Sequence, residues 1–492
     1  MKLREPLRQR KWARQRGQAL GIGVAMIFVL ALFMYLIAAF GHHVQQKVQV
    51  QTVADATALS LATMEAESLN YIAFANRAQA AQYVMALNLD AYISYVSWAQ
   101  ATLSAIKNIP LYGTPFAAAY PGVVALVNGA DEALPLMMNR VDDANRALWY
   151  TELASAEIVQ LHLLLGGHEF FDLNATAVDP TWKMEGTGWE LNGLMTVLNN
   201  LRWMETFSKA GGRPLPGSPS PSLPNGTDAD TQAAQRTMTE IVNGTRADSM
   251  LLARGFLPIG GSLFNFLNQF TRFIKRGQTK LISQSNVDSI FNTSQDDSDL
   301  TTGSVMASDD AWALTLGSLS LPLMHGSVWA KIDGSSCHIR TANLLGVGAC
   351  ASGDSNHKYK GISPYMTYQA GLRASQPGAP GEDFHQPDVF VWLYKDSDQA
   401  TMPGALNFSF EGAPAFHTTV TGIHAIARAQ AYYHRPGNWQ EPPNLFNPFW
   451  RAHLAPIAPG ISGLVSGTPA GNALAPILNV LQPFLDHTLL TH

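Results

Sequence analysis

The first 40 residues contain the feature that most constrains this chain, a basic segment followed by a long run without charge. Seven Lys or Arg residues and a single acid occupy the first 17 positions. Residues 19–40 then form a 22-residue run with no charged residue and only two glycines, Gly21 and Gly23. As a helix with a rise of about 1.5 Å per residue, the run would be roughly 33 Å long, enough to cross a bilayer core of about 30 Å. The sequence therefore predicts a transmembrane helix at residues 19–40.

The charges on either side of this run predict its orientation. Cytoplasmic flanks are enriched in Lys and Arg, so residues 1–18 are expected to be a cytoplasmic basic segment. The chain after residue 17 carries 25 basic and 36 acidic residues, and its bulk is expected on the periplasmic or extracytoplasmic side of the inner (cytoplasmic) membrane. An acidic exterior gives no support for nucleic-acid binding, which usually requires a clustered basic surface.

A cleaved secretory signal peptide is the alternative interpretation of the N-terminus. The apolar core of a signal peptide is usually about 7–15 residues, shorter than the run seen here. Ala39 and Gly41 nevertheless place small residues at the two positions that a signal peptidase recognises, with cleavage before His42. The retained anchor is the favoured interpretation, and mass spectrometry of the native N-terminus distinguishes the two.

Helix is predicted to continue well beyond the apolar run. Apolar residues recur every three or four positions from Val50 to Met64, and no proline interrupts the chain before Pro110. A single straight rod would be about 130 Å long, so breaks are expected near residues 68–70 and 88. The apolar stripe requires a partner, either downstream helices of the chain or, by self-association through the long helix, other subunits. Further helices are predicted at 132–166, 189–209, 228–242 and 263–282.

From about Ser318 the composition changes towards glycine, proline and aromatic residues, which predicts short strands. The best candidates are 389–394, 405–410 and 423–433, forming a modest antiparallel sheet packed on helices. The predicted fold class is α+β: a single N-terminal transmembrane helix continuing into a long extracytoplasmic helix, a helical middle region and a C-terminal antiparallel β-containing region. The predicted regions are 1–18 (cytoplasmic basic segment), 19–40 (transmembrane helix), 41–210 (extracytoplasmic helical region), 211–227 (Pro-rich linker), 228–317 (helical and acidic loop region), 318–454 (β-rich α+β region) and 455–492 (Gly/Pro-rich C-terminal tail).

The two cysteines, Cys337 and Cys350, both follow the apolar run. In an oxidising compartment they are expected to form one disulfide, which would contribute about 2–4 kcal/mol; two separate buried thiols are the alternative. Zinc is not expected, because no second Cys pair or His pair has ligand spacing.

Catalytic motifs give no consistent signal. The chain has neither a GxSxG nucleophile elbow nor a GxxxxGK[ST] phosphate loop. His168 and Glu169 begin like a zinc-protease helix, but Asp172 occupies the position of the second histidine. His42 and His43 are interpreted as interfacial residues rather than as a pH sensor. We therefore predict no catalytic, cofactor-binding or metal-binding residue, and no cofactor.

An aromatic, proline-rich cluster lies near the C-terminal end of the β-rich region, formed by Trp439, Phe446, Phe449 and Trp450. Two interpretations are open: a loop packed over the sheet, which is favoured, or a docking surface for another subunit.

Two short N-terminal motifs resemble the TadG-like branch of the Tad/Flp pilus-assembly proteins. Residues 50–62, VQTVADATALSLA, are similar to the LQ-x-x-A-D-A-A-A-L-A segment of that family. A five-residue motif opens the apolar run as in the family. The positions matching the family are Arg16, Gly17, Gln18, Ala19, Leu20, Gln51, Ala54, Asp55, Ala56, Ala58 and Leu59. The match spans roughly residues 14–67, and residues 427–454 also look like C-terminal parts of such proteins.

The resemblance implies a function and two expected absences. Pseudopilins of this system carry a glutamate five residues after the cleaved glycine, whereas here Ile22 follows Gly17 by five, so processing as a pilin is not expected. Some relatives contain a von Willebrand A domain with a metal-binding DxSxS motif. The most similar sequences here, beginning at Asp333 and Asp296, lack the final serine, so no such metal site is expected.

The leading hypothesis is a non-enzymatic, inner-membrane-anchored structural or assembly component of a Tad-type (Flp) pilus or related secretion apparatus that supports adhesion. Its partners would be the inner membrane and subunits of the pilus or secretion machinery, without nucleic acid. The alternatives are a membrane-tethered extracytoplasmic hydrolase and a surface adhesin, each with an unrecognised site. Turnover by the purified protein or its release into culture supernatant would favour these alternatives.

Overall fold

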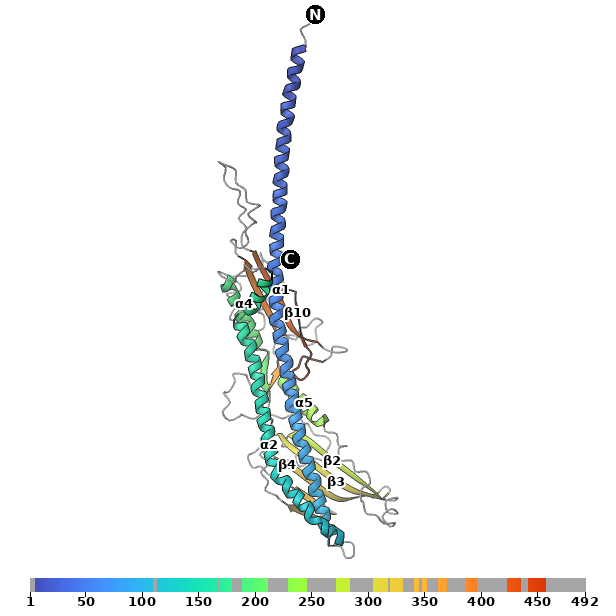
Figure 1. The fold of residues 1–492 in the computed structure, drawn as a ribbon. Coiled ribbons are helices and arrows are strands. Elements are labelled where there is room, and N and C mark those ends of the chain that lie inside the picture. Colours follow the sequence, from blue (N-terminus) through green and yellow to red (C-terminus); the bar gives the residue numbers. More distant parts are fainter. Residues whose placement is uncertain are drawn as a thin grey trace.

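One very long helix organises the fold. The computed structural model describes residues 5–108, 113–165, 168–178, 188–210, 229–245, 271–283, 304–316, 319–330, 340–344, 347–351, 362–369, 386–395, 423–434 and 441–456. Helix α1 (Glu5–Ile106) has 102 residues, which corresponds to about 150 Å at about 1.5 Å per residue. Its N-terminal part extends alone beyond the other described elements, which pack along the remainder (Figure 1).

The expected breaks near residues 68–70 and 88 are absent, because α1 is a single helix throughout. Polar side chains within a helix often weaken it by bonding to their own backbone. Here Ser68 and Asn70 instead bond to other elements. The Ser68 Oγ lies 2.8 Å from the Ser155 Oγ, and the Asn70 side chain bonds to the backbone of Trp450. Tertiary contacts therefore remove the competition that would have broken the helix.

Along α1, exposure changes sharply between the N-terminal segment and the rest. Fourteen large apolar side chains between Leu20 and Phe40 are exposed, whereas Val50 and Val53 are fully buried. Leu20–Leu89 is the one stretch in the described chain that is long and apolar enough to cross a membrane. A run of this size is unfavourable in water and suits an apolar environment, so the predicted apolar span is present as an exposed helix.

Four further helices are described, and one of them is longer than predicted. Helix α2 spans Gly113–Leu164, so that it begins before the predicted residue 132 and passes through Pro121 and Pro135. It runs antiparallel beside the second half of α1 (Figure 1). This long contact compensates for the backbone bonds that the prolines cannot make. The other helices are α3 (His168–Val178), α4 (Gly188–Met204) and α5 (Ala229–Thr245).

Two small antiparallel sheets pack against these helices. One contains β8 (Asp388–Lys395), β9 (Ile423–Tyr433) and β10 (Trp450–Leu454), with β9 in the centre. The other pairs β1 (Phe207–Ala210) with β7 (Tyr365–Tyr368). Strands β8 and β9 confirm two of the predicted strands, and the third, at 405–410, lies outside the described residues. The end of the predicted helix 189–209 is strand β1, which pairs with a segment far along the chain.

A third antiparallel sheet begins in the region 228–317, where helix and loop were predicted, and continues into the predicted β-rich region 318–454. Its strands, in spatial order, are β2 (Thr271–Ser283), β3 (Ser304–Leu316), β4 (Leu319–Ala330), β5 (Arg340–Leu344) and β6 (Val347–Ala351). The prediction of a helix at 263–282 is wrong for residues 271–282, which belong to β2. This strand pairs with β3 along its whole length. Gly277 weakens a helix in the middle of this segment, and distant pairing then decides the conformation. Strand β3 also lies in the region 228–317, which was expected to contain helix and acidic loop.

Two hydrophobic clusters hold α1 to the rest of the described chain. The larger joins α1 between Val50 and Ile72 with the end of α2, with α3 and with the β8–β9–β10 sheet. The smaller joins α1 between Ala80 and Leu87 with α2, α5 and β7. One helix thus contributes to both clusters, and the described chain combines helices with antiparallel sheets as expected for the α+β class.

Candidate functional site

The family-motif residues in α1 lie where the helix meets the central strand of the sheet. Ala54 and Ala58 are fully buried, whereas Gln51, Asp55 and Leu59 are half-buried. The Gln51 Nε2 donates to the Asp55 Oδ1 at 2.8 Å and to the backbone carbonyl of Ile426, in β9, at 2.9 Å. Asp55 therefore orients the amide that bonds α1 to β9, whereas Ala56 is half-buried on the other side of the helix.

Alanines face alanines at this junction. Every second residue of β9 from Ala425 to Ala431 is an alanine, and these four are buried in the same cluster as Ala54, Ala58 and Ala62 of α1. Small side chains on both surfaces allow the helix backbone to approach the strand backbone closely. The close approach brings the Gln51 amide within hydrogen-bonding distance of the β9 carbonyl. Packing against β9 thus explains Ala54 and Ala58 of the motif.

The other family-motif residues lie near the N-terminal end of the same helix. Arg16, Gly17, Gln18 and Ala19 are part of α1, and the Leu20 side chain is exposed. These residues are separated from Gln51 by the apolar run, so the two motifs do not meet in the structure. A continuous helix connects them.

Two asparagine side chains form hydrogen bonds with the backbone of the β8–β9–β10 sheet, one at each edge strand. On edge strand β10, Asn70 of α1 donates to the Trp450 carbonyl and accepts from the Trp450 N–H, both at 2.9 Å. On edge strand β8, Asn199 of α4 bonds in the same way to both backbone groups of Phe390 at 2.9 Å. Unpaired edge groups invite pairing with other chains. The two asparagines satisfy those groups and fix the sheet between α1 and α4.

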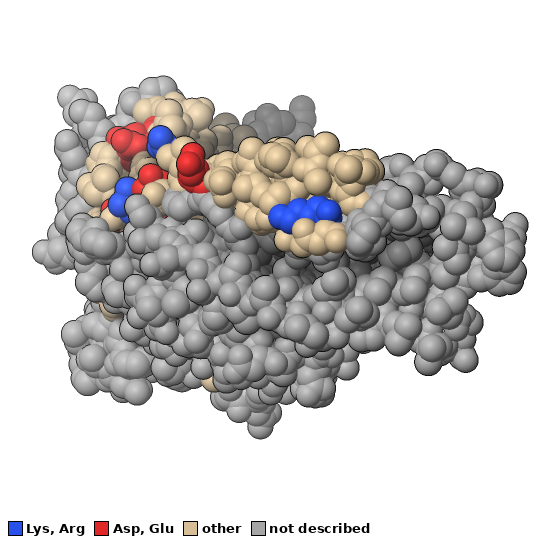
Figure 2. Space-filling view, turned by 90° about the horizontal axis from the view of Figure 1, so that it is seen from below, with Lys and Arg blue, Asp and Glu red and all other residues tan. Residues whose placement is uncertain are grey.

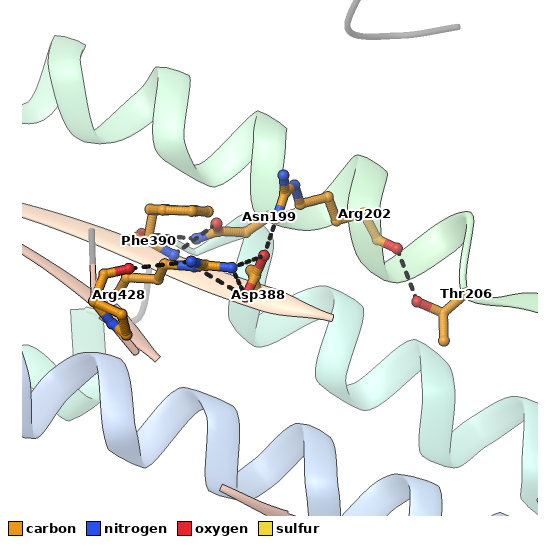
Figure 3. A network of polar contacts seen from close by, with 7 residues as sticks. Asn199, Arg202, Thr206, Asp388, Phe390 and Arg428 are labelled. Carbon is orange, nitrogen blue, oxygen red and sulfur yellow. Dashed lines mark hydrogen bonds and ion pairs between the residues drawn. The ribbon is translucent and has the colours of Figure 1, made fainter. Parts of the chain in front are cut away.

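The buried carboxylate of Asp388 joins three elements of the fold (Figure 3). The Asp388 side chain of β8 is 4 % exposed and forms ion pairs with Arg202 of α4 and Arg428 of β9. The Arg428 Nη2 lies 3.0 Å from the Asp388 Oδ1 and 2.9 Å from its Oδ2. Both guanidinium groups also lie over the Phe390 ring, at 5.3 Å and 5.7 Å from its centroid. We call Asp388, Arg202 and Arg428 the arginine clamp.

Two further carboxyl groups are fully buried in the core. Burial raises the pKa of Glu152 well above its ordinary value, and its oxygens accept bonds from the Gln79 Nε2 at 2.9 Å and the Met366 N–H at 3.0 Å. Burial also raises the pKa of Glu65, with the Asp388 charge acting in the same direction and Arg202 opposing it. Neither Glu65 carboxyl oxygen has a hydrogen-bond partner among the described residues. Burial therefore favours the neutral form of both groups.

Replacing Glu65 with glutamine is expected to reduce the loss of stability at high pH. A carboxyl whose pKa is raised on folding stabilises the protein below its unfolded pKa, about 4.5, and this contribution is lost as pH rises through the folded value. The variant cannot ionise, so its melting temperature should fall less between about pH 5 and about pH 8. Thermal unfolding of the purified full chain in detergent measures this. The control is Glu67→Gln, at an exposed position two residues away, and parallel pH curves for Glu65→Gln and the wild type would contradict the prediction.

The residues that resemble the start of a zinc-protease helix form ion-pair contacts with neighbouring side chains. The His168 Nδ1 lies 3.0 Å from the Asp172 Oδ2, and the His162 Nε2 lies 3.6 Å from the Glu169 Oε2. The side chains of His168, Glu169 and Asp172 are about half exposed or more, and the His162 side chain is less exposed. In the part of the chain that the structure describes, no three His, Cys, Asp or Glu side chains form a group that could hold a metal ion. His42 contacts Gln46, one turn along α1, at 3.1 Å.

Other predictions fall partly outside the described residues. Cys337 is not among them, and Cys350 is described only as a backbone position in β6, paired with Thr341; the disulfide stays a prediction. Phe446 and Trp450 of the aromatic cluster are buried, as expected for a loop packed over the sheet, and Phe449 is 36 % exposed. Trp439 lies outside the described residues.

Few charged side chains lie on the described surface at one end of the molecule. Viewed from below along the long axis, the described surface is mostly uncharged, and basic side chains are few or interspersed with acidic ones (Figure 2). The described part of this face has no extended basic surface of the kind that binds a phosphate backbone.

Sequence reasoning missed the arginine clamp and the buried carboxyls. Arg202, Asp388 and Arg428 belong to three separate segments, and no local pattern connects them. Glu65 did leave a signal, because it is four residues from both Leu61 and Leu69 on the apolar face of α1. A charged residue at such a position indicates a buried carboxyl.

Comparisons of the chain with protein-family models, with curated proteins and with solved structures find no match. The function proposed below therefore rests on the contacts of the described residues and on the N-terminal resemblance.

Proposed function

We propose that this chain is a non-enzymatic, inner-membrane-anchored assembly component of a Tad-type pilus or a related secretion apparatus, and that it supports adhesion. The observation that carries the proposal is the place of residues 50–62. The segment that resembles the family is the segment of α1 that seats the β8–β9–β10 sheet, and α1 continues without a break from the apolar span. In this proposal, the TadG-like segment 50–62 would connect the membrane anchor to the extracytoplasmic part of the protein.

The polar groups at the junction support a structural role rather than catalysis. Gln51, Asn70 and Asn199 bond to backbone groups of the sheet, and Asp388 is shared by two arginines. Each of these side chains joins two or more elements of the fold. Such contacts transmit force between a membrane helix and a folded body.

The membrane topology belongs to the same proposal. Residues 1–18 would lie in the cytoplasm because of their Lys and Arg content, residues 19–40 would cross the inner membrane, and the packed part would lie in the periplasm. Accessibility labelling of single positions on the two sides of the membrane tests this orientation. A cleaved N-terminus at His42 would contradict the permanent anchor.

The assembly role is tested by a clean deletion of the gene. Surface pili and surface adhesion are expected to disappear while the assembly ATPase is still expressed, and the wild-type gene supplied in trans should restore both. Normal piliation in the deletion strain would refute the role. Turnover of a substrate by the purified full chain that is lost on single substitutions would instead support a membrane-tethered enzyme.

A further inference from the structure

An apolar stripe remains exposed on the membrane-proximal half of α2, although the other side of the helix is buried. Tyr150, Ile158, Leu161 and Leu165 are 36 %, 54 %, 54 % and 49 % exposed, and Ala147 and Ala154 lie between them. At about 100° per residue these six positions fall within about 80° around the helix. We call these six residues the α2 stripe.

The other face of the same helix is already used by the fold. Trp149, Glu152, Val159 and Leu163 are buried, and Ser155 bonds to Ser68 of α1. The α2 stripe therefore points away from α1. Exposed apolar patches of several hundred Å² on folded proteins usually mark interaction sites.

The height of the α2 stripe above the membrane excludes lipid as its occupant. The Ser68–Ser155 contact places Ser155 level with Ser68, which follows Phe40 by 28 residues, about 42 Å of helix. Because α2 is antiparallel to α1, Ile158 and Leu165 lie closer, at about 25–40 Å from the end of the span. The headgroup layer extends only about 7 Å beyond the hydrocarbon core.

We infer that the α2 stripe is a dimerisation surface that receives the same stripe of a second copy of this chain. The inference rests on the membrane anchoring proposed above, since anchored copies share one orientation and one height. A two-fold axis along the membrane normal then brings each stripe against itself, which is the usual symmetry of a homodimer. Confinement to the bilayer raises the effective concentration of one copy near another.

The size and shape of the stripe suit this occupant. Its apolar side chains, with Leu164 beside them, present on the order of 500 Å² per copy, which with flanking polar residues approaches the ~800 Å² that each partner contributes to a standard interface. Ala147 and Ala154 allow two parallel helices to approach within about 8–10 Å. The area is therefore sufficient for a stable contact between anchored copies.

Different polar residues lie on the two flanks of the stripe. Glu157 lies on one flank and His162 on the other, five residues further along, and their directions differ by about 140° around the helix. In a parallel pair the Glu157 flank of one copy faces the His162 flank of its partner. The Glu157 carboxylate thus meets the imidazole of His162, whose Nε2 lies 3.6 Å from the Glu169 Oε2 and whose Nδ1 lies 2.8 Å from the Ile158 carbonyl of its own chain.

Photo-crosslinking of the full chain in its native membrane tests the inference. With p-benzoylphenylalanine at position 161, irradiation is expected to give a crosslinked dimer of this chain. The same residue at position 126, where Leu126 is 56 % exposed on the same helix, should give none. Crosslinks from position 161 mainly to lipid or to a different protein, or equal dimer yields at both positions, would overturn it.

A charge in the stripe should separate the copies without unfolding them. Leu161→Glu is expected to weaken dimerisation roughly tenfold or more, measured as the dimer fraction in nanodiscs by mass photometry, and Leu126→Glu is the matched control. Both variants should keep the wild-type melting temperature because both sites are exposed. A dimer fraction that does not respond to Leu161→Glu contradicts the inference. Carbonate extraction of the same membranes reports separately whether the anchor holds, so failure of the dimer and failure of the anchor give different results.

Discussion

Replacing Asp388 with asparagine is expected to destabilise the protein by about 3–5 kcal/mol, the usual cost of removing one partner from a buried ion pair. The substitution removes the carboxylate with which the Arg202 and Arg428 guanidinium groups form ion pairs, and the side chains of these arginines are only 14 % and 15 % exposed. Because Asp388 joins α4, β8 and β9, its loss weakens three elements together. Urea unfolding of the purified full chain in detergent measures the effect.

A surface pair of the same chemistry provides the control. The Arg146 Nη2 lies 3.1 Å from the Asp143 Oδ1, but these side chains are 45 % and 55 % exposed. Asp143→Asn is therefore expected to change the free energy of unfolding by less than about 1 kcal/mol. Similar effects for the two substitutions would mean that water screens the arginine clamp as well.

Replacing Ala58 with leucine is expected to cost about 3 kcal/mol and to separate α1 from β9. Ala58 is fully buried in the cluster that contains the β9 alanines, so three added carbon atoms have no space, and overpacking of this kind typically costs about 1–3 kcal/mol. The displaced helix would also lose the Gln51 bond to the Ile426 carbonyl. We therefore expect lower thermal stability and, if the proposed function is right, loss of surface pili while the chain stays in the membrane.

Ala56→Leu is the matched control for this prediction, because Ala56 is half-buried and lies on the opposite side of α1 from Gln51. It should leave the melting temperature within a few degrees of the wild type. A stable, fully piliated Ala58→Leu strain would show that the helix and the strand need no close approach.

Local patterns were sufficient for several elements. Strand β9 has the predicted bounds, 423–433, and β8 differs from its prediction by one residue at each end. Both contain alternating or continuous apolar residues that decide their conformation locally. The N-terminal helix was equally clear, because uncharged and Pro-free sequence leaves few other structures.

Errors arose where distant segments decide the structure. The predicted breaks in α1 did not occur because Ser68 and Asn70 bond to α2 and β10. The predicted helix at 263–282 gave way to strand β2 because β3 pairs with it. A single-sequence pattern contains no information about which distant backbone will be available, so these errors share one cause.

The candidate site shows the same division. The family motif identified Gln51, Ala54 and Asp55, but the bond from Gln51 to the Ile426 carbonyl spans 375 positions. Nothing in the motif itself indicates a sheet as the partner. Likewise, the arginine clamp joins Arg202 to Asp388 across 186 positions, and no local pattern contains both.

The sequence by itself determined the apolar span, the charge asymmetry across it, and the long helix that follows, because hydrophobicity, charge and helix propensity are properties of neighbouring residues. Only the tertiary structure decided which face of α1 receives the sheet, which carboxyls are buried, and which stripe of α2 stays exposed. These outcomes depend on packing between segments far apart in the chain. Burial and ionisation are set by the final neighbours of a side chain rather than by its neighbours in sequence.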